Sequence, residues 1–343
     1  MDRKERFYAT IERRPVDRPA SWIGMPVPEA LPALLDYFKV KDLLALKNTL
    51  NDDIWPIDVP FHCPPANHIA CAFDFSAGSA SDPEHRTLTT PGWFMDKTDP
   101  ACIEEFFWPN PAEHMSFDEC RKVIRSAPQD FAIMGVMWSA HFQDACAAFG
   151  MENALMTMLT DPEMFQAVID RITEFYLQAN EIFYEAGRGM MDAVLIGNDF
   201  GSQSALMVAP ESLRKFVFPG TRRLIEQAHA YGYKVIHHSC GAIREIVPDL
   251  IGLGADAIHP IQALATGMDA KSLHDEWGKT ASFCGGVDAQ HLLVAGTPDQ
   301  IRNKVHELRR IFPTGLIISP SHEAVLPDIP PANLAALFSG LNG

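Results

Sequence analysis

The stretch KVIHHSCGAIREIVPDLIGLGADAIHPI, residues 234–261, contains two short apolar runs separated by a segment of a different pattern. KVIHHSC (234–240) and AIHPI (257–261) are typical of buried strands, because they are short, apolar and rich in β-branched residues. REIVPDLIGLG (244–254) is typical of a short helix that ends on glycine. A strand, a helix and a strand in this order predict a parallel βα unit.

The same alternation extends over most of the chain. We predict further strands at 131–137, 193–199, 281–287 and 316–321, and helices at 152–187, 210–232 and 297–312. Asp161-Pro162 marks a helix start within the first of these helical segments, because proline fits the first turn of a helix. At least six such strands without a glycine-rich dinucleotide fingerprint predict a (β/α)8 TIM-type barrel, with a doubly wound open sheet as the alternative.

The first third of the chain has a different character. Residues 1–130 are irregular and rich in proline, most clearly at 52–65 and 108–114, and proline at this density breaks long elements. We therefore predict one domain over residues 1–343, with an elaborated N-terminal region at 1–130 and regular βα units at 131–343.

Composition excludes several classes of function. The chain has 343 residues, with 28 Lys and Arg against 44 Asp and Glu, a formal net charge of −16. This acidic balance argues against nucleic acid or an anionic membrane surface as the main partner. The N-terminus has no apolar signal core and no apolar run is long enough to span a bilayer, so we expect a cytoplasmic protein. Seven scattered cysteines, an odd number, argue against a disulfide framework.

In a barrel, functional side chains follow the carboxyl ends of the strands. Trp138 follows the strand at 131–137 in this way. The other polar residues at these positions are Asn198, Asp199, His238, Cys240, His259, Gln262, Cys284, Asp288, His322 and Glu323.

The sharpest local feature among these residues is His238-Ser239-Cys240. Because side chains of a strand alternate between its faces, His238 and Cys240 point to one side, and an imidazole and a thiol there form two corners of a tetrahedral zinc site. The alternative is a buried thiol beside a hydrogen-bonded histidine. A third ligand must come from another strand, and the candidates are His322, in a proline-framed turn, and Cys284, whose apolar surroundings are more typical of core packing.

Two further groups of polar residues are candidates for substrate contacts. Asn198 and Asp199, with Gln203 four residues after Asp199, follow an apolar strand, where they either handle substrate and protons or cap a βα turn. Asp52 and Asp53 precede a strand-like stretch, and adjacent residues of a strand point to opposite faces, so at most one of them can enter a pocket.

These segments together resemble the uroporphyrinogen decarboxylase superfamily, which includes the zinc-dependent cobalamin methyltransferases. The resemblance covers nearly the whole chain in family order and implies a (β/α)8 barrel with a funnel at its carboxyl-end face. The matching segments are Arg14–Pro19, Asn198–Gln203, His237–Gly241, Gly285–Gln290, Gly296–Pro298, Ser319–His322 and Pro330–Asn333.

The resemblance implies one of two chemistries. Decarboxylases of this superfamily use no cofactor and hold a polycarboxylate with an N-terminal arginine pair, but this chain has no Lys or Arg between Arg18 and Lys39. The methyltransferases bind zinc through His-x-Cys and a third residue near the last strand, usually Cys, and these positions match His238, Cys240 and His322. Two imidazoles and one thiolate leave the zinc with a charge of +1, which favours polarising a methoxy oxygen.

The resemblance therefore predicts a zinc-dependent methyltransferase that works with a corrinoid (cobalamin) protein on a methyl ether or methoxy compound, and it suggests a homodimer. We assign catalysis to Asp199 and Gln203. Substrate contacts are assigned to Asp52, Asp53, Asn198 and Trp138. One alternative is a cofactor-free decarboxylase of a smaller substrate that uses Asp199, Asp52 or Asp53, and another is a barrel that binds a corrinoid or tetrapyrrole without chemistry.

Overall fold

Seven parallel strands form one curled sheet in the computed structural model, which describes residues 1–64, 66–76, 87 and 89–342. The strands follow one another through the sheet in chain order, β2 to β8. They are β2 (Ile54–Asp58), β3 (Ala132–Trp138), β4 (Ala193–Gly197), β5 (Lys234–His238), β6 (Ala257–Ile261), β7 (Ser282–Val287) and β8 (Leu316–Pro320). A separate short parallel pair joins β1 (Met25–Pro26) to β9 (Ala324–Val325).

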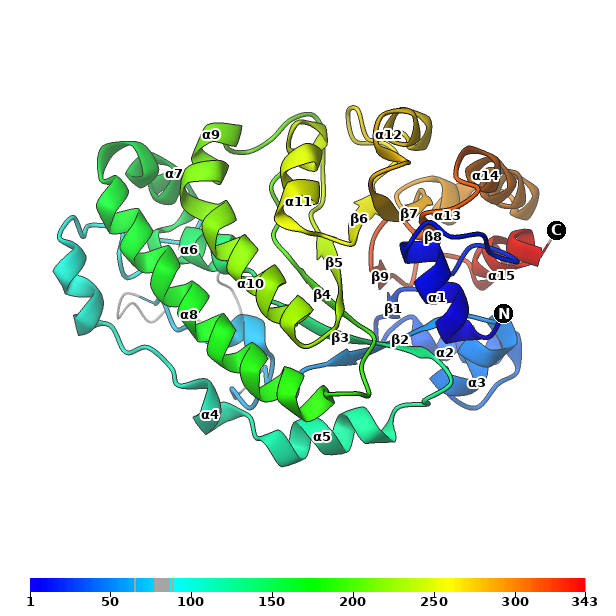
Figure 1. Ribbon diagram of the computed structural model, residues 1–343, viewed down its shortest axis with the longest axis horizontal. Coiled ribbons are helices and arrows are strands. Elements are labelled where there is room, and N and C mark those ends of the chain that lie inside the picture. The colour runs from blue at the N-terminus through cyan, green and yellow to red at the C-terminus, as the bar shows by residue number, and fades with distance from the viewer. Residues whose placement is uncertain (65, 77–86, 88, 343) are drawn as a thin grey trace.

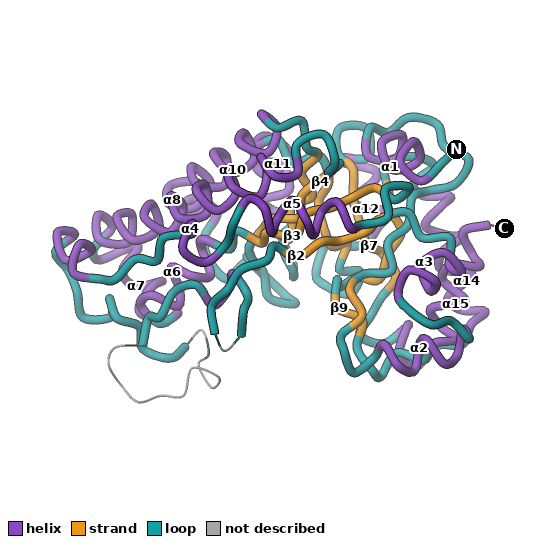
Figure 2. Tube along the Cα trace, turned by 90° about the horizontal axis from the view of Figure 1, so that it is seen from below, coloured by secondary structure: helices purple, strands orange, loops and turns teal. Residues whose placement is uncertain are grey.

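Helices surround this sheet (Figure 1). In Figure 2 the strands lie in the middle, with α8 and α10 towards one end of the molecule and α14, α15, α2 and α3 towards the other. The helices are α1 (Arg3–Ile11), α2 (Leu31–Phe38), α3 (Leu43–Leu50), α4 (Pro111–His114), α5 (Phe117–Ser126), α6 (His141–Phe149), α7 (Met151–Thr160), α8 (Pro162–Gly187), α9 (Pro210–Ser212), α10 (Phe218–Ala230), α11 (Val247–Leu253), α12 (Ala270–Trp277), α13 (Leu292–Ala295), α14 (Pro298–Ile311) and α15 (Pro331–Ser339). Among the described residues, none of these helices is long and apolar enough to cross a membrane.

The architecture confirms the TIM-type prediction over the open-sheet alternative, because the strand order never reverses as it does in a doubly wound sheet. β6 has the predicted bounds, whereas β4 and β5 each end two residues earlier than predicted. The residues after them belong to the loops that carry functional groups. Proline at the first turn of α8 begins that helix at Pro162, as predicted.

Residues 20–23 lie between the two edges of the curled sheet and join them. On one side, Trp22 N donates to Ile318 O of β8 at 3.1 Å, and Ile318 N donates to Ala20 O at 2.9 Å. On the other side, Asp53 N donates to Ser21 O at 3.2 Å, just before β2 begins. This short segment therefore takes the place of the eighth strand.

The concave side of the sheet is filled by alternate residues of the strands, as a barrel interior requires. Met134 and Val136 of β3, Leu195 of β4 and Cys284 of β7 belong to this inner cluster, together with Phe7 of α1. The outer faces of the strands pack against the helices in a second, larger core. Side chains that continue the inner alternation beyond a strand end therefore emerge at the mouth of the barrel.

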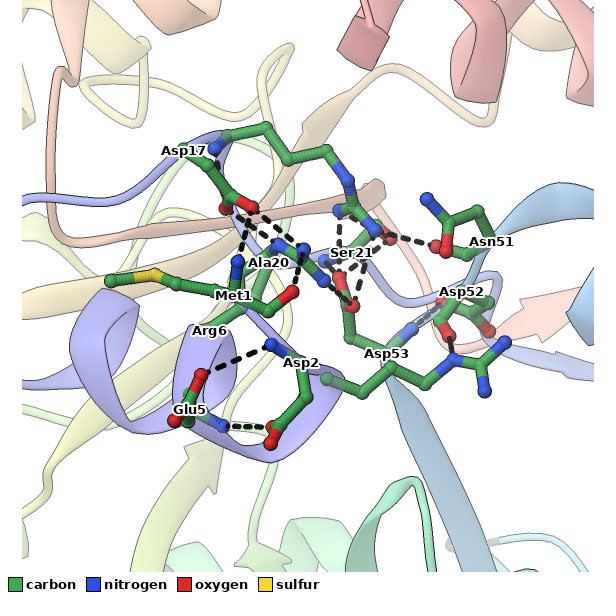
Figure 3. A network of polar contacts seen from close by, with 12 residues as sticks. Met1, Asp2, Glu5, Arg6, Asp17, Ala20, Ser21, Asn51, Asp52 and Asp53 are labelled. Carbon is green, nitrogen blue, oxygen red and sulfur yellow. Dashed lines mark hydrogen bonds and ion pairs between the residues drawn. The ribbon is translucent and has the colours of Figure 1, made fainter.

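Buried charges hold the joining segment against β2 (Figure 3). The Asp53 carboxylate accepts hydrogen bonds from Ser21 N at 2.9 Å and from the guanidinium groups of Arg6 and Arg18 at 2.7 Å each. Asp52 accepts from Ile23 N at 3.2 Å and pairs with Lys47. We call these five charged residues, Arg6, Arg18, Lys47, Asp52 and Asp53, the seam network.

Replacing Asp53 with asparagine should lower the free energy of unfolding by about 3–5 kcal/mol, because the buried guanidinium group of Arg18 would lose its counter-charge and that of Arg6 would keep only Asp17. Urea unfolding followed by circular dichroism measures the change. Asp130→Asn is the matched control: Asp130 pairs with Arg3, but its side chain is 63% exposed, so its loss should cost about 1 kcal/mol or less. Equal effects of the two substitutions would contradict the role given to the seam network.

Candidate metal and active site

Polar side chains gather where β4, β5, β6 and β8 end. Asp199 follows β4, His238 ends β5 and Cys240 lies two residues beyond it. His259 lies in β6, and Glu323 follows β8. β4, β5 and β6 are neighbours in the parallel sheet, so their carboxyl ends meet at one edge. We call these five residues the strand-end cluster.

The Nε2 atom of His238 is the centre of the first half of this cluster. It lies 3.2 Å from Asp199 Oδ1 and 3.4 Å from Cys240 Sγ. The backbone N–H of Cys240 donates to the same Asp199 oxygen at 2.9 Å. The alternation of the strand explains the arrangement, since His237 points the other way and stacks on Phe200 at 6.1 Å between ring centroids.

The charges of this group reinforce one another. Burial would raise the pKa of Asp199, but hydrogen bonds from His238 and the Cys240 N–H lower it to about 2. Burial likewise opposes the charged form of His238, yet Asp199 and Cys240 raise its pKa well above the usual value. The pKa of Cys240 is lowered in spite of burial, because His238 and His322 stabilise the thiolate. The cluster therefore favours the Cys240 thiolate and the Asp199 carboxylate, which are forms that bind metals, together with a protonated His238 ring, which would have to release its Nε2 proton to bind one.

The donor atoms of Asp199, His238 and Cys240 fit a metal ion. They lie within 4.8 Å of one another. In a tetrahedral zinc site, bonds of about 2.0–2.3 Å separate neighbouring ligand atoms by roughly 3.3–3.7 Å. The Nε2–Sγ distance of 3.4 Å and the Nε2–Oδ1 distance of 3.2 Å are close to that range. One imidazole, one thiolate and a further oxygen or nitrogen ligand form a donor set that zinc accepts.

His322 and Cys284, the two candidates for the third ligand, lie in different surroundings. His322 follows β8, has a side chain 47% exposed and contacts the Cys240 side chain. Its Nδ1 accepts a hydrogen bond from Ala324 N at 3.1 Å. Cys284 is fully buried inside the curled sheet, 3.4 Å from Ser319 Oγ, and burial raises its pKa to about 12. Cys284 is therefore placed as a core thiol. His322 interacts with Cys240, but it is not among the three residues, Asp199, His238 and Cys240, whose donor atoms lie within 4.8 Å of one another.

The other residues predicted for the site, Trp138 and Asn198 for substrate contact and Gln203 for catalysis, lie in different surroundings. Trp138 packs edge-on against the His238 ring, with 5.3 Å between centroids. Asn198 is buried and its Oδ1 accepts a hydrogen bond from Phe142 N at 2.9 Å, so it is engaged with the start of α6. Gln203 is exposed in the loop after β4, where its carbonyl accepts from Thr266 N at 2.9 Å.

Asp52 and Asp53 lie at the other end of the sheet. Both precede Ile54, the first residue of β2, so they sit at the amino ends of the strands and not at the mouth. Both side chains are fully buried and engaged in the seam network. The structure does not bring either carboxylate to the strand-end cluster, because the strand runs away from them towards that cluster.

Three residues at the mouth received no role from the sequence. His259 is fully buried, with its Nδ1 2.9 Å from Nδ1 of His238. Glu323 Oε2 lies 3.6 Å from the same His238 nitrogen. Asp58 is the last residue of β2 and lies on the same face of the strand as Ile54, which belongs to the inner cluster. Desolvation raises the pKa of Asp58, although His68 opposes the shift. Their positions at strand ends were a signal, but the sequence does not tell which strand ends are neighbours.

Comparisons with known proteins identify the family and support the fold. Residues 96–342 match the model of the uroporphyrinogen decarboxylase (URO-D) family. A methylated-thiol–coenzyme M methyltransferase of Methanosarcina mazei is 25% identical over 250 residues, which cover 71% of this chain and 60% of that protein. A uroporphyrinogen decarboxylase of Citrifermentans bemidjiense is 28% identical over 184 residues, 51% of this chain and 47% of that protein.

The matched regions thus span about half to three fifths of the length of these curated relatives. Among solved structures, a methyltransferase from Methanosarcina mazei superposes with a TM-score of 0.70 at 16% identity, covering 99% of this chain and 98% of that one. At this identity the superposition supports the fold, and the family model covers well over half of the sequence. The chain therefore belongs to the uroporphyrinogen decarboxylase (URO-D) family.

Proposed function

We propose that this protein is a zinc-dependent methyltransferase that moves a methyl group between a small methyl ether or methoxy compound and a corrinoid protein. The observation that carries the proposal is the convergence of Asp199, His238 and Cys240 at the mouth of the barrel. The similarity to a protein named as a methylated-thiol–coenzyme M methyltransferase supports the same class of reaction.

In this proposal His238, Cys240 and His322 hold the metal. A zinc ion in this site would polarise the heteroatom that carries or receives the methyl group. Ligation through Nε2 of His322 requires its proton on Nδ1, so the hydrogen bond from Ala324 N has to be released. Because the His322 side chain is about half exposed, its ring can turn with little loss of packing.

Asp199 and Trp138 would orient the substrate beside the metal. The Asp199 side chain is 37% exposed, so one edge of the carboxylate faces solvent while Oδ1 is held by Cys240 N. Gln143 Nε2 contacts Oδ2 at 3.4 Å and restricts rotation of the group. The Trp138 ring offers an apolar surface for a methyl group, and Gln203 contributes from the exposed loop after β4.

A cofactor-free decarboxylase of a smaller substrate is the second candidate. It is favoured by the similarity to a protein named as a uroporphyrinogen decarboxylase and by Asp58, an acidic residue at the mouth with a raised pKa. Against a polycarboxylate substrate, the guanidinium groups of Arg6 and Arg18 are occupied by Asp17 and Asp53 at the opposite end of the sheet. The sequence between residues 19 and 38 adds no Lys or Arg.

Metal content tests the proposal directly. Protein purified without chelator should contain about one zinc per chain, and Cys240→Ala should lose it because the thiolate contributes the strongest ligand. Cys284→Ala is the matched control, since this thiol faces the barrel interior and should leave the zinc in place. Elemental analysis of the three proteins gives the answer, and a Cys240→Ala protein with full zinc would refute the site.

The third ligand is open to a separate test. His322→Ala should weaken zinc affinity by roughly 100-fold or more, whereas Asp199→Asn, which keeps the shape and one oxygen, should change it by about 10-fold or less. Competition with a zinc-binding dye measures both. The reverse ranking would assign the third position to Asp199 and leave His322 as a hydrogen-bond donor to Cys240.

The two candidate reactions predict different responses to the same treatments. With a methoxybenzoate and free cob(I)alamin, the proposed enzyme should form methylcob(III)alamin, which is followed by its absorption spectrum, and a chelator should stop the reaction. Asp58→Asn should reduce this rate less than Cys240→Ala does. Chelator-insensitive release of carbon dioxide from a carboxylated substrate, lost in Asp58→Asn, would instead support the decarboxylase.

A further inference from the structure

We infer that His259 is a positioning residue that accepts the Nδ1 proton of His238 and so fixes the orientation in which His238 presents Nε2 to the metal. The inference rests on the proposed function, because it concerns the same site. It assigns a role to a histidine that lies on a different strand and does not itself face the Cys240 thiol.

The contact between the two rings is a hydrogen bond. The two Nδ1 atoms are 2.9 Å apart, which is an ordinary distance for an N–H donor and a nitrogen acceptor. Glu323 Oε2, the nearby carboxylate oxygen, lies 3.6 Å from the same His238 nitrogen, which is too far for a hydrogen bond. His259, and not Glu323, therefore accepts the hydrogen bond from Nδ1–H of His238.

The direction of this bond follows from the other nitrogen of each ring. Nε2 of His238 faces Cys240 Sγ and Asp199 Oδ1, so as a metal ligand it carries no proton and the remaining proton sits on Nδ1. Nδ1 of His259 is then the acceptor, and its own proton sits on Nε2. That Nε2 is buried and has no hydrogen-bond partner among the residues that the structure describes.

A second metal ion shared by the same two histidines is the competing explanation, since the ligand atoms of His238, His259 and Glu323 also lie within 4.8 Å of one another. Two nitrogens bound to one tetrahedral zinc at about 2.0–2.1 Å would be roughly 3.4 Å apart. The observed 2.9 Å is shorter than this and matches a hydrogen bond. The geometry therefore favours one metal on the Nε2 side and a proton on the Nδ1 side.

The surroundings of His259 suit a fixed acceptor. The side chain is fully buried, with the Trp22 ring 5.4 Å away on one side and the His238 ring 5.0 Å away on the other. Trp22 belongs to the segment that joins the edges of the sheet, and it packs in the inner cluster. A ring held in this way orients its neighbour before any metal binds, which is how outer partners of ligating histidines raise metal affinity.

Two substitutions at position 259 separate positioning from packing. His259→Leu removes the acceptor and should weaken zinc affinity by roughly 10- to 100-fold. His259→Asn keeps an oxygen near the position of Nδ1 and should restore affinity to within about 3-fold of the native protein. Zinc titration of the metal-free full chain against a chelating dye measures affinity, and Co²⁺ absorption bands report the geometry of the bound ion.

Two further variants serve as controls. His237→Leu changes a histidine that is about as buried as His259 and lies next to His238 in β5. Its side chain faces away from the strand-end cluster, so the substitution should leave zinc affinity unchanged. His238→Ala should abolish zinc binding. Native affinity in His259→Leu, or failure of His259→Asn to restore it, overturns the inference while the zinc site stands. Unchanged zinc binding in His238→Ala overturns the proposed function itself.

Discussion

The Asp53 carboxylate joins three parts of the chain that are distant in sequence. It binds Arg6 of α1, Arg18 just before the joining segment and Ser21 within that segment, and it precedes β2 directly. Without this carboxylate, the segment at 20–23 would be held against the β2 edge by the backbone hydrogen bond from Asp53 N to Ser21 O and by the bond from Ile23 N to Asp52. Buried ion pairs are costly to break, and here the cost falls on the closure of the barrel.

Closure at the amino ends has consequences at the mouth. A sheet that curls into a barrel points alternate side chains of every strand to one interior, and the last inward residues of neighbouring strands then meet. Trp22 links the joining segment to the mouth, since it lies in that segment and its ring packs beside the His259 ring. The same network occupies Arg6 and Arg18, so the N-terminal arginines serve the fold and are withdrawn from any substrate.

Local patterns in the sequence predict the parts that depend on local order. Strand–helix alternation predicts the sheet, and the period of two within KVIHHSC places His238 and Cys240 on one side. The roles that depended on contacts between distant strands were harder to assign. Asp52 and Asp53 look like candidate site residues until Lys47, Arg6 and Arg18 are found around them. His259 lies 21 residues from His238, and only the parallel pairing of β5 with β6 brings the two rings together.

Cys240 and Cys284 illustrate how depth in the barrel decides chemistry. Both are inward-facing cysteines of the same sheet, and the apolar sequence around Cys284 already favours core packing for that thiol. Cys284 is the third residue of β7, where apolar neighbours and burial keep its thiol protonated. Cys240 lies beyond the end of β5, where His238 and His322 lower the pKa of its thiol against the opposing effects of burial and of the Asp199 carboxylate. Of these two cysteines, a thiolate is favoured at Cys240 and not at Cys284, because the histidines beside Cys240 stabilise the negative charge.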